Sequence, residues 1–209
     1  VCLDNATAVL DGFTIRRSPV TNAFVAVVVE NAGGTVRNCL VKENYGAMAI
    51  YLDNVGTVES CIISNNYTVG VSVSAGSRLR NSVICNNTWS NSFRGGGGIS
   101  MNGGVVSNCI IRANRIICTS NDTILGGGVN MLNGTLINCL IVKNSLSLPS
   151  GTGAAYGGGV TAGVGGQVSG CKIINCTIAD NSIVALEDAM GGGLLNANNS
   201  IVRNCIIYG

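Results

Sequence analysis

A nine-residue unit that recurs along the chain is the feature that most constrains its fold. The clearest copy, residues 36–44, reads Val-Arg-Asn-Cys-Leu-Val-Lys-Glu-Asn. Related segments begin at residues 58, 79, 106, 136 and 173, a shortened copy begins at 202, and a degenerate copy occupies residues 10–15. Eight copies of one template are typical of repeat proteins, in which each unit stacks on the next. We therefore expect a single solenoid domain of about eight coils over residues 1–209.

Small or apolar residues occupy fixed places in every copy of the unit. Counted from its Cys as position 0, these places are −3, 0 and +2, and position +2 is always β-branched. Position 0 holds Phe13, Cys39, Cys61, Ser82, Cys109, Cys139, Cys176 and Cys205. The alternation of positions 0 and +2, with β-branching, predicts a strand with one buried face.

An Asn closes each complete unit at position +5. The six residues are Asn44, Asn66, Asn87, Asn114, Asn144 and Asn181. Asn tolerates left-handed backbone and bonds its own turn, so these residues are predicted to form a corner. Coils stacked about 4.8 Å apart would also let the Asn side chains bond one another.

A second strand signal precedes each unit and begins with glycine. Gly98, Gly128, Gly159 and Gly193 each end a run of glycines and precede an aliphatic residue. Glycine at a fixed place permits a positive φ or a close approach of the backbone to the next coil. One coil is therefore predicted to contain a Gly corner, a short strand, a turn, the Cys strand and an Asn corner.

Two solenoids fit this spacing, the right-handed parallel β-helix and the leucine-rich repeat. Leucine-rich repeats carry a helix or an extended leucine-bearing segment on one side. The segments between the units here are rich in Gly, Ser and Asn and poor in helix-forming residues. The sequence therefore favours an all-β, right-handed parallel β-helix.

The pattern Gly-Gly-(Val/Ile/Leu) followed by Asn-Cys-x-Ile-x-x-Asn resembles repeats of bacterial surface proteins with the pectin-lyase-like β-helix fold. It is similar to the repeats of chlamydial polymorphic outer-membrane proteins, and residues 8–15 resemble the start of many secreted bacterial β-helices. The chain departs from the chlamydial pattern by having Cys or Ser where an aromatic is usual, and only Phe13 keeps one. The resemblance implies a secreted or cell-surface protein and says little about activity.

Charge and hydropathy exclude several partners. A net charge of +2 without a basic tract argues against nucleic acid or anionic lipid as a main partner. The longest apolar run, residues 23–29, is far shorter than the roughly 20 residues of a membrane helix, so we expect no membrane span.

The ten cysteines are predicted to be mostly structural. Those at position 0 should be buried as small apolar residues, although adjacent coils come close enough for occasional disulfides. The chain has neither His nor a Cys-x-x-Cys pair, so we expect no metal and no cofactor. Cys85 is predicted to point outward and Cys118 to lie in an insert, which would make them accessible thiols.

Position +1 holds an outward-facing apolar row. Its members are Leu40, Ile62, Val83, Ile110 and Leu140, continued by Thr177 and Ile206. Monomers rarely expose large contiguous apolar patches. Either the row is covered by nearby inserts or it makes lateral contact with another chain, and we therefore single it out as a candidate self-association surface.

The inserts that follow the Asn corner form the second candidate surface. They cover residues 88–94, 115–125, 145–156 and 182–190 and should emerge on one side, where repeat proteins often bind ligands. Trp89, Phe93, Arg94 and Tyr156 lie in them, and aromatic rings can stack on sugars or simply pack a loop. Surface glycans are therefore one expected partner.

The acidic residues are scattered over different positions of the coil. β-Helical polysaccharide lyases and hydrolases need clustered carboxylates, and no such motif occurs here. We therefore expect no catalytic residues, with polysaccharide degradation as the alternative. The chain begins and ends within the repeat, so it is either a segment of a longer protein or a unit that stacks end to end into a fibre. The expected function is that of a structural or adhesive scaffold.

Overall fold

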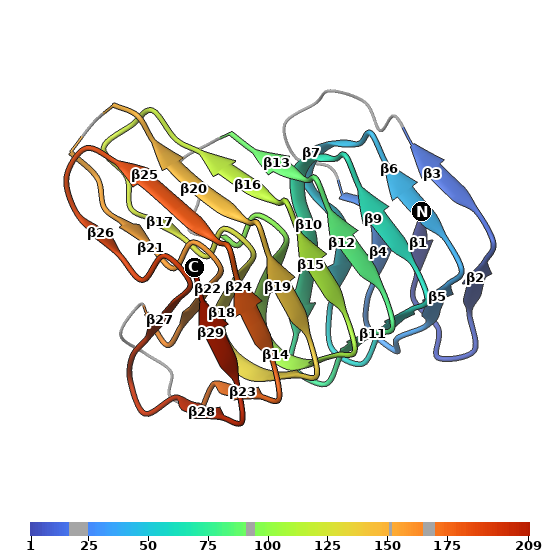
Figure 1. Ribbon diagram of the computed structural model, residues 1–209. Helices are drawn as coiled ribbons and strands as arrows, with labels where there is room; N and C mark the ends of the chain where they lie inside the picture. The colour runs from blue at the N-terminus through green and yellow to red at the C-terminus, as the bar shows by residue number, and fades with distance from the viewer. Residues whose placement is uncertain (17–24, 91–94, 151, 165–169) are drawn as a thin grey trace.

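The computed structural model describes residues 1–16, 25–90, 95–150, 152–164 and 170–209 (Figure 1). Its regular elements are 29 strands, and the described residues contain no helix. The strands pair in parallel from coil to coil, as in β7 with β10 and β9 with β12. The predicted solenoid is confirmed, and the leucine-rich-repeat alternative is wrong because the segments between the repeated units also form strands that pair into parallel sheets.

Each coil passes through three strand positions. The largest sheet has two limbs, which β14 and β18 join because each runs through both. The first limb contains β1 (Cys2–Leu3), β4 (Val25–Val29), β7 (Tyr45–Leu52), β10 (Tyr67–Ser74), β14 (Ile99–Ser107), β18 (Val129–Ile137), β22 (Val160–Ala162) and β27 (Leu194–Asn196). The second contains β2 (Val9–Asp11), β5 (Thr35–Arg37), β8 (Thr57–Glu59), β11 (Arg78–Arg80), β23 (Lys172–Ile174) and β28 (Ile201–Arg203).

The third strand position forms sheet B, with one strand from each of the eight coils. In chain order these are β3 (Thr14–Arg16), β6 (Leu40–Lys42), β9 (Ile62–Ser64), β12 (Val83–Cys85), β15 (Ile110–Arg112), β19 (Leu140–Val142), β24 (Thr177–Ala179) and β29 (Ile206–Tyr208). They lie side by side without a break in register (Figure 1).

The core is a continuous apolar column inside the coils. Positions −3, 0 and +2 point into it, so that Val58, Cys61 and Ile63 of one coil are at most 1% exposed. Burying an aliphatic side chain of this size contributes about 1.5–3 kcal/mol, which makes the repeated unit the main source of stability. Phe13, predicted to be inward at position 0, is 57% exposed, because it belongs to the first coil and only one coil stacks on it.

The corners differ from our prediction by one residue. Left-handed backbone (φ near +50°) occurs at position −1, as in Asn38 and Ser60, and at position +4, as in Glu43 and Asn65. The Asn at +5 follows the second of these residues and is itself not left-handed. Our assignment of left-handed backbone to the +5 Asn is therefore wrong, whereas its place at a corner is right.

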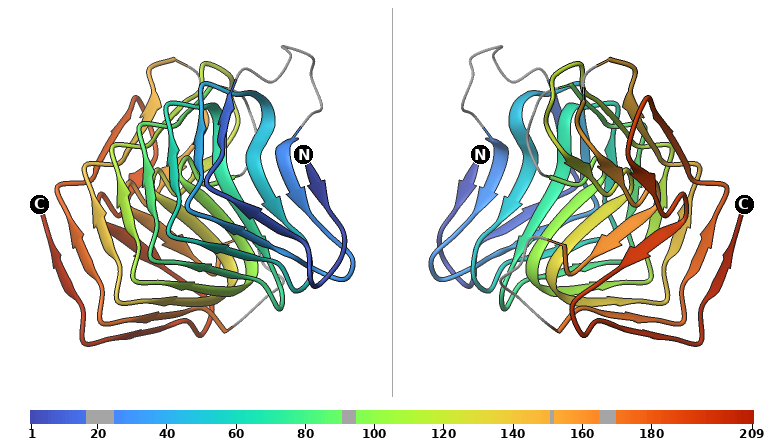
Figure 2. Two further views of the ribbon diagram at one scale, coloured as in Figure 1. Left: turned by 90° about the vertical axis from the view of Figure 1, so that its right-hand side faces the viewer. Right: turned by 90° about the vertical axis from the view of Figure 1, so that its left-hand side faces the viewer.

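The described parts of the inserts emerge on one side, as predicted, and stack on each other as two further sheets (Figures 1 and 2). Sheet C contains β13 (Thr88–Trp89), β16 (Arg115–Ile117), β20 (Ser145–Leu148) and β25 (Ser182–Ala185). Sheet D contains β17 (Ile124–Leu125), β21 (Ala155–Tyr156) and β26 (Ala189–Met190). Between them lies a second apolar core of Ile116, Cys118, Ile124, Leu146, Leu148 and Ala155.

All ten cysteines are free, and eight of them are buried. The two thiols predicted to be accessible are among the buried ones. Cys85 is 5% exposed because it lies between Ser64 and the longer Arg112 on adjacent strands. Cys118 is 3% exposed because it belongs to the second core. The exposed thiol is Cys2, and Cys205 is half-buried.

Candidate interaction face and the polar columns behind it

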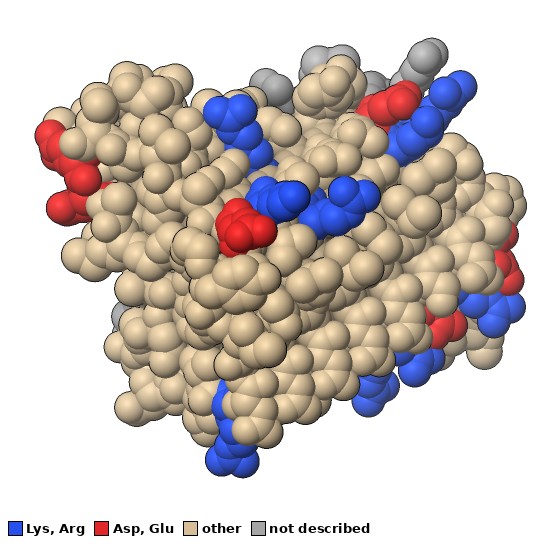
Figure 3. Space-filling view, in the orientation of Figure 1, with Lys and Arg blue, Asp and Glu red and all other residues tan. Residues whose placement is uncertain are grey.

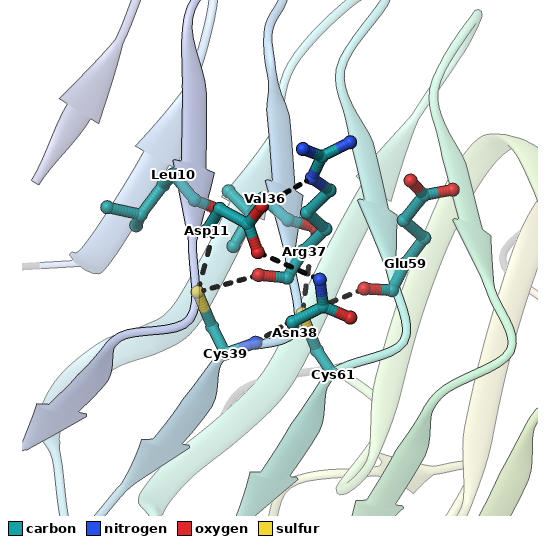
Figure 4. Close-up of polar contacts among 8 residues, drawn as sticks. All are labelled: Leu10, Asp11, Val36, Arg37, Asn38, Cys39, Glu59 and Cys61. Carbon is teal, nitrogen blue, oxygen red and sulfur yellow. Dashed lines mark hydrogen bonds and ion pairs between the residues drawn. The ribbon is translucent and has the colours of Figure 1, made fainter.

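The Cys and Ser residues at position 0 form a column of hydrogen bonds inside the corner that begins at position −1; we call it the thiol column. Cys61 donates to the carbonyl of Glu59 (3.2 Å) and accepts from the backbone N–H of Cys39 in the preceding coil (3.5 Å) (Figure 4). Ser82 makes equivalent bonds, to Arg80 O (2.8 Å) and from Cys61 N–H (3.1 Å). Each small side chain thus satisfies backbone groups that the bend removes from the strand ladder.

The six Asn at position +5 form a second column, the amide column, inside the next corner. The Oδ1 of Asn114 accepts both the backbone N–H (3.1 Å) and the side-chain Nδ2–H (2.9 Å) of Asn87. Its own Nδ2 donates to Ile84 O (2.9 Å) and to Asn144 Oδ1 (3.0 Å). The predicted side-chain bonding from coil to coil is confirmed, and all six Asn are buried.

Glycine is required where the next strand passes the amide column. A Cβ on Gly128 would lie 2.7 Å from Gly159 O and 2.9 Å from Asn144 Nδ2. Gly98 and Gly159 meet the same pair of neighbours, a glycine carbonyl and an Asn side chain. The glycine runs therefore follow from close stacking against the amide column.

Burial and neighbouring thiols raise the pKa of Cys61, Cys139 and Cys176 in the thiol column. Desolvation raises the pKa of Cys61 to about 11. The neighbouring side chains of Cys109 and Cys139 lower the pKa of Cys109 and raise the pKa of Cys139 to about 12. A thiol that stays protonated and buried is a poor nucleophile, so this column has a structural role.

The outer face of sheet B carries the apolar row at position +1. Ile62 is 48%, Ile110 39% and Leu140 37% exposed, whereas Leu40 and Val83 are half-buried. Parallel pairing places them directly next to one another from β6 to β19. The described residues of the inserts therefore leave the row uncovered at Ile62, Ile110 and Leu140. In Figure 3 the middle of this face is free of charge, and the charged residues gather along its edges.

A row of polar residues at position −1 borders the apolar row on one side; we call it the outer Asn row. Its members are Asn38, Ser60, Asn81, Asn108, Asn138, Asn175 and Asn204. Their side chains are exposed and partly bonded to one another, as in Asn138 Nδ2 to Asn108 Oδ1 (3.3 Å). Beyond it, at position −2, Arg37 pairs with Asp11 (2.8 Å) (Figure 4).

Positions +3 and +4 border the apolar row on the other side. Lys42 and Glu43 form an ion pair there (3.2 Å), and Arg112, Lys143 and Asp180 are exposed farther along. The face thus consists of an apolar centre with hydrogen-bonding and charged borders, a composition typical of protein interfaces.

The predicted ligand-contact residues are not gathered into one site. Trp89 is half-buried on β13, its ring packs against the second core, and its indole N–H is buried without a partner among the described atoms. Tyr156 lies on β21, and Phe93 and Arg94 lie outside the described residues. The more exposed aromatic group is Tyr45 with Tyr67, whose stacked rings have centroids 4.7 Å apart.

No group of three or more His, Cys, Asp or Glu that could hold a metal ion occurs among the described residues. The same part of the chain has no helix long and apolar enough to cross a membrane.

Residues 1–168 match the sequence family described as "Right handed beta helix region". The chain belongs to the right-handed β-helix family. No curated protein and no solved structure matches it. The family includes enzymes as well as proteins without catalytic activity, so membership establishes the handedness and the fold, and function depends on the site.

Proposed function

We propose that this β-helix is a non-catalytic structural or adhesive scaffold, located at the cell surface or secreted, that works through contacts along its outer face. The observation that carries the proposal is the apolar row of sheet B, in which Ile62, Ile110 and Leu140 remain exposed although the inserts could have covered them. An apolar stripe that continues over several coils is unusual on a monomer and favours a macromolecular contact.

The polar groups of the interior support a structural role. The thiols donate to backbone carbonyls and the Asn amides bond one another, so these groups serve the stacking of coils. Three of the acidic residues, Asp11, Glu43 and Glu59, form ion pairs on the outside of the coils. This distribution favours a scaffold over polysaccharide chemistry, which requires carboxyl groups held about 5–9.5 Å apart.

The test compares adhesion of the unmodified chain with that of Ile62→Lys/Ile110→Lys, using coated beads and bacterial cells. Val55→Lys is the control, because Val55 is also exposed (56%) but lies between β7 and β8, away from sheet B. We expect at least a tenfold loss of adhesion for the double variant and none for the control. Equal adhesion of all three proteins contradicts the proposal.

Polysaccharide degradation is the alternative that a second assay addresses. The purified chain is incubated with polyuronates and neutral polysaccharides, and new chain ends are measured. The scaffold proposal expects no release above a buffer control, and sustained turnover would replace it with an enzymatic function. Electron microscopy of the same samples tests whether the scaffold takes the form of an end-to-end fibre.

A second candidate function, glycan binding, is favoured by the Tyr45–Tyr67 pair. The two rings are stacked at 9° and are 37% and 56% exposed, which leaves aromatic surface available to a sugar face. A glycan array with the unmodified chain and Tyr67→Ala tests this function. Binding that Tyr67→Ala abolishes would support it.

A further inference from the structure

We infer that the partner of the sheet B face is a second copy of this chain, packed sheet B against sheet B, with both solenoids running in the same direction. This inference rests on the proposed function, because it names the occupant of the face that the scaffold uses. In such a pair the two-fold axis runs parallel to the solenoid axis, and each coil faces the same coil of its partner.

The face is large enough for a weak, specific dimer. Eight coils about 4.8 Å apart and five residues of about 3.3 Å each give roughly 34 by 16 Å, or about 550 Å² on each copy. The pair would bury about 1,100 Å², at the low end of specific interfaces. Sheets C and D turn back from sheet B at the +4 corner and leave the face open (Figure 2). We therefore expect reversible association at micromolar concentrations or above.

The parallel arrangement matches the rows of the face to one another. With the axis over position +1, the apolar row packs on itself, so that Ile62 meets Ile62 and Leu140 meets Leu140 of the other copy. Position +3 then faces position −1. Arg112, exposed at +3, meets Asn108 of the outer Asn row, whose amide oxygen can accept a hydrogen bond.

The charged borders do not oppose this arrangement. Arg37 lies on β5, beyond the corner at position −1, and pairs with Asp11. Glu43 lies at the +4 corner and pairs with Lys42. Both charged pairs therefore stay at the rim of the contact.

The opposite arrangement, with antiparallel solenoids, matches less well. When all eight coils overlap, it places the second coil against the seventh. Leu40 would then meet the polar Thr177, so that the apolar row would not pack on itself along its whole length. The match of apolar residues therefore favours the parallel arrangement.

Disulfide trapping tests the partner and the direction together. The background is Cys2→Ser/Cys205→Ser, which removes the exposed and the half-buried thiol. Ile62→Cys and Leu140→Cys are made separately in this background, mixed in equal amounts with distinguishable tags, and oxidised mildly. Both sites are solvent-exposed, so the substitutions should leave the core intact. Val55→Cys, at an exposed site away from sheet B, is the control.

We expect homotypic dimers of Ile62→Cys and of Leu140→Cys, little mixed dimer, and at least tenfold less dimer from Val55→Cys. A predominance of the mixed dimer would overturn the direction, because only antiparallel copies bring these two sites together. Dimer yields no higher than that of Val55→Cys, together with a monomer in sedimentation at millimolar concentration, would overturn the inference. Adhesion that still depends on Ile62 and Ile110 would then leave the proposed scaffold function standing with a different partner.

Discussion

The two inner corners of the coil solve the same problem with different side chains. At both, a left-handed residue turns the chain, and the next residue points inward to bond backbone groups that the strands cannot reach. The thiol column uses Cys in six coils and Ser82 in another, whereas the amide column uses Asn in all six described cases. The corner of the thiol column therefore accepts more than one residue type, whereas the corner of the amide column does not.

The difference follows from the number of bonds that each side chain makes. Ser82 replaces a thiol because one small group that both donates and accepts is sufficient. An Asn of the amide column accepts two hydrogen bonds and donates two, as Asn114 does. No other uncharged side chain of that length offers the same set, so the column repeats without substitution.

Removing one amide should produce the largest loss. Asn114→Ala leaves the Asn87 backbone N–H, the Asn87 side chain and Ile84 O without their partner. At about 1–3 kcal/mol for each unsatisfied buried group, we expect the free energy of unfolding to fall by about 4 kcal/mol. Urea unfolding measures it, with the exposed Asn102→Ala as control. A loss below about 1 kcal/mol would show that the column contributes little.

The glycine next to the amide column should be nearly as sensitive. Gly128→Ala places a Cβ against Gly159 O and Asn144 Nδ2, and we expect a loss of about 3 kcal/mol from overpacking. Gly192→Ala is the matched control, because the nearest atom to its Cβ would be Asn181 O at 3.7 Å, an ordinary contact. Equal thermal stability of the two variants would refute close stacking at this corner.

The thiol column should distinguish Ser from Ala. Cys61→Ser keeps a donor for Glu59 O and an acceptor for Cys39 N–H, so we expect a change within about 1 kcal/mol. Cys61→Ala removes both and leaves a small cavity, for a loss of about 2 kcal/mol. Urea unfolding of the two variants measures the difference. If Cys61→Ala is as stable as Cys61→Ser, the hydrogen bonds of the thiol do not contribute to stability.

Alkaline pH should affect the thiol column and leave the amide column unchanged, since amides do not titrate. The raised pKa of Cys61, about 11, means that the folded protein holds the thiol proton more tightly than the unfolded chain. Its stabilisation is present below about pH 9 and is lost as pH rises toward 11, a change of roughly 2 kcal/mol. Unfolding midpoints between pH 8 and 11 should therefore fall less steeply in Cys61→Ser. Equal slopes would exclude this linkage.

The coil could be predicted well from the sequence because the positions that repeat are also the positions that are buried. Val58, Cys61 and Ile63 recur at fixed spacing, and each equivalent set is buried wherever coils stack on both sides. Phe13 was wrongly predicted to be buried, because its place in the repeat does not show whether coils stack on it from both sides. The left-handed residue at −1 could have been found from the repeated Asn-Cys pair, since Asn is enriched in left-handed backbone.

The inserts were harder to predict because they do not share a template. Ile116, Leu146 and Cys118 form a second core only when stacked, and their spacing from the Asn corner alone did not indicate a strand. Cys118 was therefore assigned to an exposed loop. The apolar row was predicted correctly to face outward by the alternation along the strand, whereas its exposure depended on where the inserts turn.

The accessibility of the ten thiols tests the stacking of coils most directly. Alkylation of the folded chain at neutral pH, followed residue by residue by mass spectrometry, should modify Cys2 first and Cys205 more slowly. The other eight, including Cys85 and Cys118, should react only as fast as the protein unfolds. Rapid alkylation of Cys61, Cys109 or Cys139 under native conditions would contradict an inward-facing column and, with it, the fold on which every proposal depends.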